Sequence, residues 1–179
     1  MLFRSYHAAR PGTSADVWAL PLTPPSGAAL KPSLILQAAS YEGAAQFSPD
    51  GRWILYASDE SRQMEIYVAP FALTSVPAGK RQISVAGAIV LAGGAPRWQP
   101  GGREVIYVAP DRRLMATEIV TRGDTLEVGA TRPLFGLLSP QNATFDVAMD
   151  GRRFLVLAAP EPNAVPPITL VQNWVSAAN

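Results

Sequence analysis

The sequence predicts an all-β protein, and more specifically a β-propeller segment of about four blades built from four-stranded antiparallel sheets. A turn phrase recurs three times, and its glycines Gly51, Gly102 and Gly151 lie 51 and 49 residues apart. A fixed period of this size indicates one structural unit that is repeated. The 17 Pro and 14 Gly among 179 residues suit a turn-rich β chain and argue against long helices. The three phrases are residues 47–53, 98–104 and 147–153.

Each phrase predicts a tight turn between two strands. Asp-Gly or Gly-Gly between apolar runs is typical of a hairpin, because a primed turn needs a positive φ that glycine adopts without steric cost. Asp50 and Asp150 occupy one repeat position, where the second phrase has Gly101. A catalytic carboxylate pair is therefore a weaker interpretation than an Asp that accepts bonds from nearby backbone N–H groups. The predicted structural turn residues are Asp50, Gly51, Gly101, Gly102, Asp150 and Gly151.

An apolar run after each turn predicts the second strand of a blade. These runs are rich in β-branched and aromatic residues and are bounded by Pro, Asp or Ser. They are apolar almost without interruption, so we expect both faces of each strand to be buried. The runs are residues 53–58, 104–109 and 154–159.

A polar loop, a third strand and in two units a fourth strand follow. Four short antiparallel strands in a unit of about 40–50 residues are typical of a propeller blade. The loops are residues 59–63, 111–113 and 161–167, and the third strands are residues 65–71, 114–120 and 168–174. The fourth strands are residues 81–85 and residues 125–128, which continue toward Leu134 and Phe135.

The first and last units are incomplete. Residues 2–6, 16–22 and 33–37 match a second, third and fourth strand, and Trp174 is followed by only five residues. We therefore expect one partial propeller domain whose first blade lacks its first strand and whose last blade lacks its fourth. Open edge strands tend to pair with another chain, so we expect either self-association or dependence on sequence upstream of Met1. The predicted blades are residues 1–40, 41–88, 89–138 and 139–179.

Composition excludes several classes of protein. The net charge of +1 gives no electrostatic footprint for nucleic acid. No run reaches the roughly 20 apolar residues that span a bilayer, and the first residues lack the apolar core of a signal peptide. The absence of Cys excludes disulfides and thiolate metal sites.

The sequence shows no catalytic, metal or cofactor motif. His7 is the only histidine, and no Gly-x-Ser-x-Gly elbow accompanies it, so a Ser-His-Asp triad is not expected. One histidine without cysteine is also a poor metal-ligand set. Gly93 and Gly94 lack the Lys-Ser/Thr that would follow in a phosphate loop. We expect no cofactor and no enzyme activity in this chain.

The loops between second and third strands are the candidate binding residues. In a propeller these loops gather on one face, where they can recognise a protein or a small ligand. The alternative is an ordinary solvated loop. The periodic Trp18, Trp53, Trp98 and Trp174 are expected to fill the space between blades. The candidate partner-binding residues are Asp59, Glu60, Arg62, Asp111, Arg112 and Arg113.

The repeats resemble the WD-repeat-like propeller family of TolB and related bacterial proteins. The matching residues are the turn at residues 47–51 and the strand residues 66–68. Nearly the whole chain also resembles the propeller regions attached to bacterial Ser/Thr protein kinases. In that family the propeller is the C-terminal, extracytoplasmic part of a longer chain and binds proteins or ligands. The matching residues are 58–61, 65–71, 96–98, 101–104, 133–135, 150–154 and 173–174.

The chain departs from the kinase-attached family in two ways. It has no Gly-rich loop, His-Arg-Asp or Asp-Phe-Gly motif, and it holds roughly half the blades of a full ring. The leading interpretation is a non-catalytic interaction or sensing module from a larger bacterial signalling protein. The alternatives are a TolB-like periplasmic protein and the accessory propeller of a prolyl-oligopeptidase-like hydrolase. The resemblance implies the extracytoplasmic side.

Overall fold

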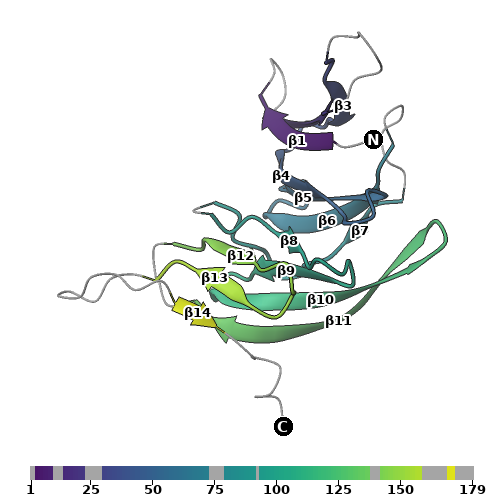
Figure 1. The fold of residues 1–179 in the computed structure, drawn as a ribbon. Helices are drawn as coiled ribbons and strands as arrows, with labels where there is room; N and C mark the ends of the chain where they lie inside the picture. Colours follow the sequence, from purple (N-terminus) through teal and green to yellow (C-terminus); the bar gives the residue numbers. More distant parts are fainter. Residues whose placement is uncertain are drawn as a thin grey trace.

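The chain folds into four consecutive antiparallel sheets that stack face to face (Figure 1). The computed structural model describes residues 3–9, 14–22, 30–72, 79–91, 93–137, 142–158 and 169–171. Over these residues the regular elements are all strands, so none of them is a helix that could span a membrane. The all-β prediction and the blade-like sheets are confirmed.

Each sheet is formed by strands that follow one another in the chain, as in a propeller blade. The first blade holds β1 (Phe3–Ala8), β2 (Asp16–Pro21) and β3 (Ser33–Leu36). The second holds β4 (Glu42–Phe47), β5 (Trp53–Ser58), β6 (Glu65–Pro70) and β7 (Arg81–Gln82). The third holds β8 (Arg97–Trp98), β9 (Glu104–Val108), β10 (Arg113–Arg122) and β11 (Thr125–Gly136). The fourth holds β12 (Phe145–Val147), β13 (Phe154–Val156) and β14 (Thr169–Val171).

The register of the first blade places β1 at the second-strand position. Ala8 pairs with Asp16 as Ser58 pairs with Glu65 in the second blade, and both pairings run on to a proline at the end of the third strand. The described part of the first blade therefore comprises strands two to four. The described part of the fourth blade comprises strands one to three, with β14 at its edge.

The hydrophobic core consists of three clusters, each between two consecutive blades. Strand β5 explains the arrangement, because successive side chains in a strand point to opposite faces. Trp53 and Leu55 pack with the third blade, whereas Ile54 and Tyr56 pack with the first. In the same way β9 contributes to the cluster with the second blade and, through Ile106, to the cluster with the fourth. Both faces of these two strands are buried, which accounts for their continuous apolar sequence.

The outer faces of the two end blades are more open. Phe154 and Val156 are buried against the third blade, but Leu155 is 49% and Leu157 50% exposed. The expectation of two buried faces is wrong for this strand, because no further blade covers that side among the described residues. On the first blade, Tyr6 is 40% exposed and stacks on Trp18 with ring centroids 6.4 Å apart.

Several predicted strands have different limits in the structure. The predicted strand at residues 81–85 pairs only over Arg81–Gln82, after which Ile83 donates its N–H to Ile66 O at 2.7 Å and Val85 is exposed. The run at residues 154–159 is a strand only to Val156. Strand β11 is continuous over twelve residues, with register shifts in its pairing to β10. The predicted loop at 161–167 and Trp174 lie outside the described residues.

The three repeated turns share one hydrogen-bond pattern, which differs from the expected primed turn. Ser48 donates its N–H to Trp53 O at 2.9 Å, and Gly51 donates to Ser48 O at 2.9 Å. Gly51 has a φ of 71°, whereas Asp50 is not among the non-glycine residues with positive φ, so a two-residue type I′ turn is excluded. The equivalent bonds recur from Gln99 and Gly102 and from Ala148 and Gly151. A four-residue connection with a left-handed glycine is therefore the repeated unit.

Candidate functional site

The blades present two opposite faces, because each strand runs from one face to the other. The turn face carries the repeated turns at residues 48–52, 99–103 and 148–152 together with the β10–β11 connection at Gly123 and Asp124. The loop face carries the connections from second to third strand and the connections between blades. The residues predicted to bind a partner lie on the loop face, and those predicted to be structural lie on the turn face.

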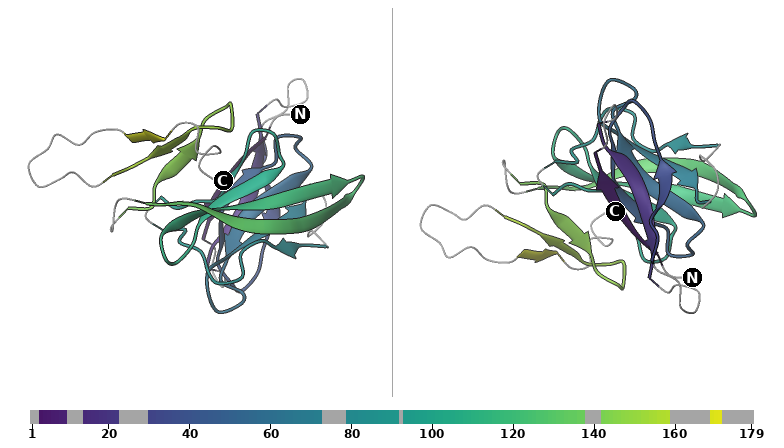
Figure 2. Two further views of the ribbon diagram at one scale, coloured as in Figure 1. Left: turned by 90° about the horizontal axis from the view of Figure 1, so that it is seen from below. Right: turned by 90° about the horizontal axis from the view of Figure 1, so that it is seen from above.

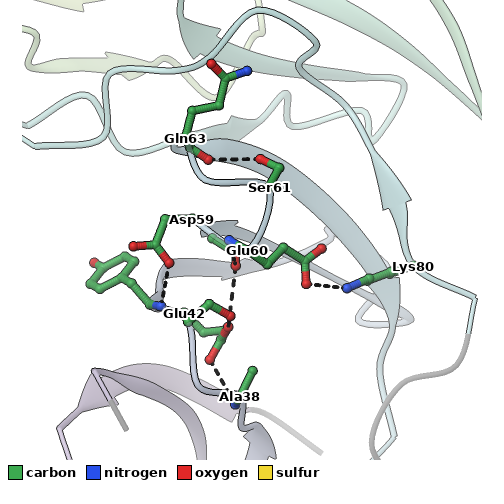
Figure 3. Close-up of polar contacts among 10 residues, drawn as sticks. Ala38, Glu42, Asp59, Glu60, Ser61, Gln63 and Lys80 are labelled. Atoms are coloured by element: carbon green, nitrogen blue, oxygen red, sulfur yellow. Dashed lines mark hydrogen bonds and ion pairs between the residues drawn. The ribbon is translucent and has the colours of Figure 1, made fainter.

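On the second blade, the loop-face residues Asp59 and Glu60 bond to neighbouring segments (Figure 3). Asp59 accepts a hydrogen bond from Tyr41 N at 2.8 Å, which ties its loop to the connection between the first and second blades. Glu60 forms an ion pair with Lys80. The Lys80 ammonium also lies 5.6 Å from the centroid of the Tyr67 ring, within cation–π range.

Two hollows adjoin the Glu60–Lys80 ion pair, and we call them together the paired hollows. Both are lined by Glu60 and Lys80. The outer one, about 460 Å³, adds Ser61, Tyr67 and Gln82. The inner one, about 250 Å³, reaches the first blade and adds Leu36, Gln37, Ala38, Glu42, Tyr56 and Gly79. Each recess is therefore lined by the ion pair and by one tyrosine, Tyr67 in the outer and Tyr56 in the inner.

The predicted residues of the third blade bond mainly within their own loop and toward the fourth blade. Asp111 accepts from Arg113 N at 3.1 Å and lies 3.6 Å from the Arg113 guanidinium. Arg112 donates to Asn142 O at 3.1 Å. None of the three lines the paired hollows. The structure therefore places the two predicted loops on one face without joining them in one recess.

Two of the predicted arginines have an unusual backbone conformation. Arg62 has a φ of 74° and Arg112 a φ of 66°, in the left-handed region that favours glycine. Each donates its N–H to the residue three positions earlier, Asp59 O or Ala109 O, at 2.8 Å. Arg62 is exposed, and its guanidinium has no hydrogen-bond or ion-pair partner among the described residues. The two loops differ in length, so comparing their sequences does not reveal that the two arginines share this conformation.

Sequence reasoning also missed a buried carboxylate at the start of β6. Glu65 is fully buried and accepts hydrogen bonds from Gln63 Nε2 at 2.5 Å, from Gly87 N at 2.9 Å and from Ser84 Oγ. Ser84 and Gly87 belong to the connection between the second and third blades. Glu65 therefore holds that connection against the second blade, which is a structural role.

Glu42 is a second buried carboxylate, and it lies between the first and second blades. It is 3% exposed and accepts from Ser40 Oγ at 2.7 Å and from Ala38 N at 3.1 Å. Burial raises the pKa of this carboxyl, and the nearby charge of Asp16 adds to the increase, although the hydrogen bonds oppose it. Glu42 also lines the inner hollow.

On the turn face, the predicted turn residues hold their turns and approach the neighbouring blade. Asp50 accepts from Arg52 N at 3.1 Å, and Asp150 accepts from Arg152 N at 2.9 Å. Gln99 donates its side-chain N–H to Gly151 O at 3.2 Å, which joins the third and fourth blades. Three of the predicted turn residues, Asp50, Gly101 and Gly102, also line a cavity of about 490 Å³ that the sequence did not indicate.

Comparison with known proteins identifies the architecture. No protein-family model matches the chain, and no curated protein matches it. The solved structure of a putative 6-phosphogluconolactonase from Bacteroides uniformis matches 80% of this chain and 41% of that one, with 15% identity and a TM-score of 0.50. TolB from Acinetobacter baumannii matches 95% of this chain and 50% of that one, with 14% identity and a TM-score of 0.46.

The fold is that of a partial β-propeller. The 15% identity to the lactonase structure is too low to carry more than the fold. The chain spans half or less of the length of the two solved structures. Neither of these two proteins is named as a kinase, so they do not show the resemblance to kinase-attached propellers.

Proposed function

We propose that this partial propeller is a non-catalytic interaction module that binds a protein partner on its loop face. The paired hollows carry the proposal. Both recesses are lined by the Glu60–Lys80 ion pair. Arg62 follows in the same loop, and its guanidinium has no partner among the described residues. Arginine is among the residues that most often dominate protein interfaces, and an exposed guanidinium without a partner among the described residues is available to another protein.

The proposed module belongs to a larger bacterial signalling protein. This part of the proposal depends on the resemblance of the sequence to kinase-attached propellers. The name 6-phosphogluconolactonase applies to the structural neighbour that carries it. We propose no hydrolase reaction for this chain, because a propeller hosts many unrelated functions and the likeness is one of fold.

Site-specific photo-crosslinking in cells that produce the protein tests this function. A photoreactive residue at Arg62 on the loop face is compared with one at Arg152 on the turn face, since both side chains are exposed. We expect a discrete crosslinked protein from position 62 and none from position 152. Crosslinks from position 152 alone, or from neither position, would contradict the proposal.

A charge swap then separates binding from folding. In Glu60→Lys the ion pair becomes two like charges, whereas the double variant Glu60→Lys/Lys80→Glu restores an ion pair with reversed polarity. We expect both variants to lose the crosslink at position 62, while the double variant keeps the melting temperature of the original protein. A double variant that recovers the crosslink would show that the ion pair only stabilises the fold.

A further inference from the structure

The β10–β11 hairpin extends past the other strands of its blade and covers part of the turn face (Figures 1 and 2). Strand β9 begins at Glu104, which pairs with Glu118, so the hairpin beyond this point has no β9 residue beside it. Its tip reaches the second blade. The Arg52 guanidinium bonds to Gly123 O and lies 2.9 Å from the Asp124 carboxylate.

A cleft of about 490 Å³ lies between this hairpin and the turns of the second and third blades. Its volume is within the range of about 300–1,000 Å³ that is usual for ligand sites. Trp53 and Trp98 line it together with the two turns. Ile119, Val120 and Thr121 of β10 line it from the hairpin. One wall of the cleft is therefore the edge of a strand.

The backbone of β10 presents a free donor and a free acceptor at this edge. Ile119 donates its N–H to Arg103 O at 2.8 Å, on the β9 side of the strand. Backbone groups two residues apart in a strand point the same way. Thr121 therefore directs its N–H and C=O to the side where β9 no longer runs, and no strand pairs with them there among the described residues.

The tryptophans supply a second, independent observation. Trp53 is 4% and Trp98 5% exposed, and both line the cleft. Their indole Nε1 atoms are buried and have no acceptor among the residues that the structure describes. Because these two nitrogens have almost no exposed surface, a ligand in the cleft does not reach them. The rings instead give the cleft an aromatic wall, against which apolar side chains of a ligand can pack.

We propose that this cleft binds an extended peptide segment, which adds a strand beside β10 at Thr121. A peptide backbone supplies both a carbonyl for the Thr121 N–H and an N–H for its carbonyl, which is the pairing used in strand addition. The wall also carries Asp50 and Arg103, of opposite charge, beside the space for the peptide side chains. This site is on the face opposite the paired hollows and does not depend on them.

Random peptides displayed on phage, selected against the whole chain, provide the probe. A selected peptide is synthesised, and its dissociation constant is measured through tryptophan fluorescence. The peptide is then N-methylated at one residue at a time. Strand addition at Thr121 predicts that methylation weakens binding by about tenfold at one residue, whose N–H pairs with the Thr121 carbonyl, and has little effect at its two neighbours, because their N–H groups face away from β10. Equal losses at all three residues, or no loss at any residue, would overturn the proposal.

Two matched variants place the site. Gly101 lines the cleft, has no positive φ and leaves open space around an added Cβ, and Gly136 has the same freedom outside the cleft. We expect Gly101→Phe to weaken peptide binding by about tenfold or more and Gly136→Phe to leave it unchanged. Equal affinity in the two variants would refute the site. Binding lost in Glu60→Lys but kept in Gly101→Phe would refute it too and assign the peptide to the paired hollows.

Discussion

Replacing the turn glycine Gly51 by alanine should destabilise the protein through its backbone alone. Gly51 has a φ of 71°, and a Cβ built on it has no atom within 4 Å, so the new methyl group meets no neighbour. A non-glycine residue in the left-handed region costs roughly 1–2 kcal/mol. Alanine also restricts the unfolded chain, which returns about 0.4–1 kcal/mol. The expected net loss in the free energy of unfolding is about 1 kcal/mol.

Gly101 provides the control, because it occupies the repeat position next to the left-handed glycine. It also has open space around an added Cβ but has no positive φ. Gly101→Ala should therefore leave stability unchanged or raise it by about 0.4–1 kcal/mol. The difference between the two alanine variants isolates the strain, at about 1–2 kcal/mol. Gly51→Asn should recover part of the loss, because asparagine tolerates this conformation.

Urea and thermal unfolding measure these differences. For a chain of this size, 1 kcal/mol corresponds to roughly 2–4 °C in melting temperature. The reasoning fails if Gly51→Ala is as stable as the original protein, or if Gly101→Ala loses as much stability as Gly51→Ala. The first result would mean that the turn does not need a left-handed residue. The second would mean that the loss comes from something other than φ.

Four further predictions concern stability and association. Glu65→Ala leaves the Ser84 hydroxyl and the Gly87 N–H without their acceptor, so the free energy of unfolding measured in urea should fall by about 3 kcal/mol. Glu65→Gln should lose less, and equal losses in the two variants would contradict the role of the hydrogen bonds. Arg62→Gly relieves the strain of a left-handed arginine and should raise the free energy of unfolding by about 0.5 kcal/mol. Arg113 has no positive φ, so Arg113→Gly should lower the free energy of unfolding. A loss of stability in both variants would show that Arg62 is not strained. Burial raises the pKa of Glu42 above its ordinary value of 4.5, so the folded state holds this proton more tightly than the unfolded state. Its contribution to stability is therefore complete below pH 4.5 and is lost as the pH rises through the raised pKa. Urea unfolding from about pH 4 upward should show the free energy of unfolding falling with pH, and Glu42→Gln should reduce this fall. The double variant Leu155→Ser/Leu157→Ser makes the open face of the fourth blade polar and should therefore reduce self-association measured by light scattering. Met149 is also exposed, and Met149→Ser is the control. An original protein that is monomeric at every concentration would disprove this expectation.

The strands and turns of this fold were predictable where they depend on residues close together in the sequence. Turn glycines stand out because few other residues accept a positive φ, and apolar runs such as that of β5 stand out because both faces are buried. Glu65 offered no such signal, because a glutamate before a strand looks the same whether it is solvated or bonded to Ser84 and Gly87 further along the chain. The turn-face cleft was missed for a related reason. It forms where two blades and a long hairpin meet, and no single repeat contains that geometry.

The arrangement of the core in three clusters, each between two consecutive blades, has a consequence for how the molecule opens. Each blade in such an array is stabilised only by contacts with its neighbours, so an end blade can unfold while the rest stays folded. Amide hydrogen exchange should therefore be slowest in β5 and β9, which have packed blades on both sides, and faster in β1 and β13. A partner bound at the inner hollow, which reaches the first blade, would slow exchange in β1 and leave β13 unaffected.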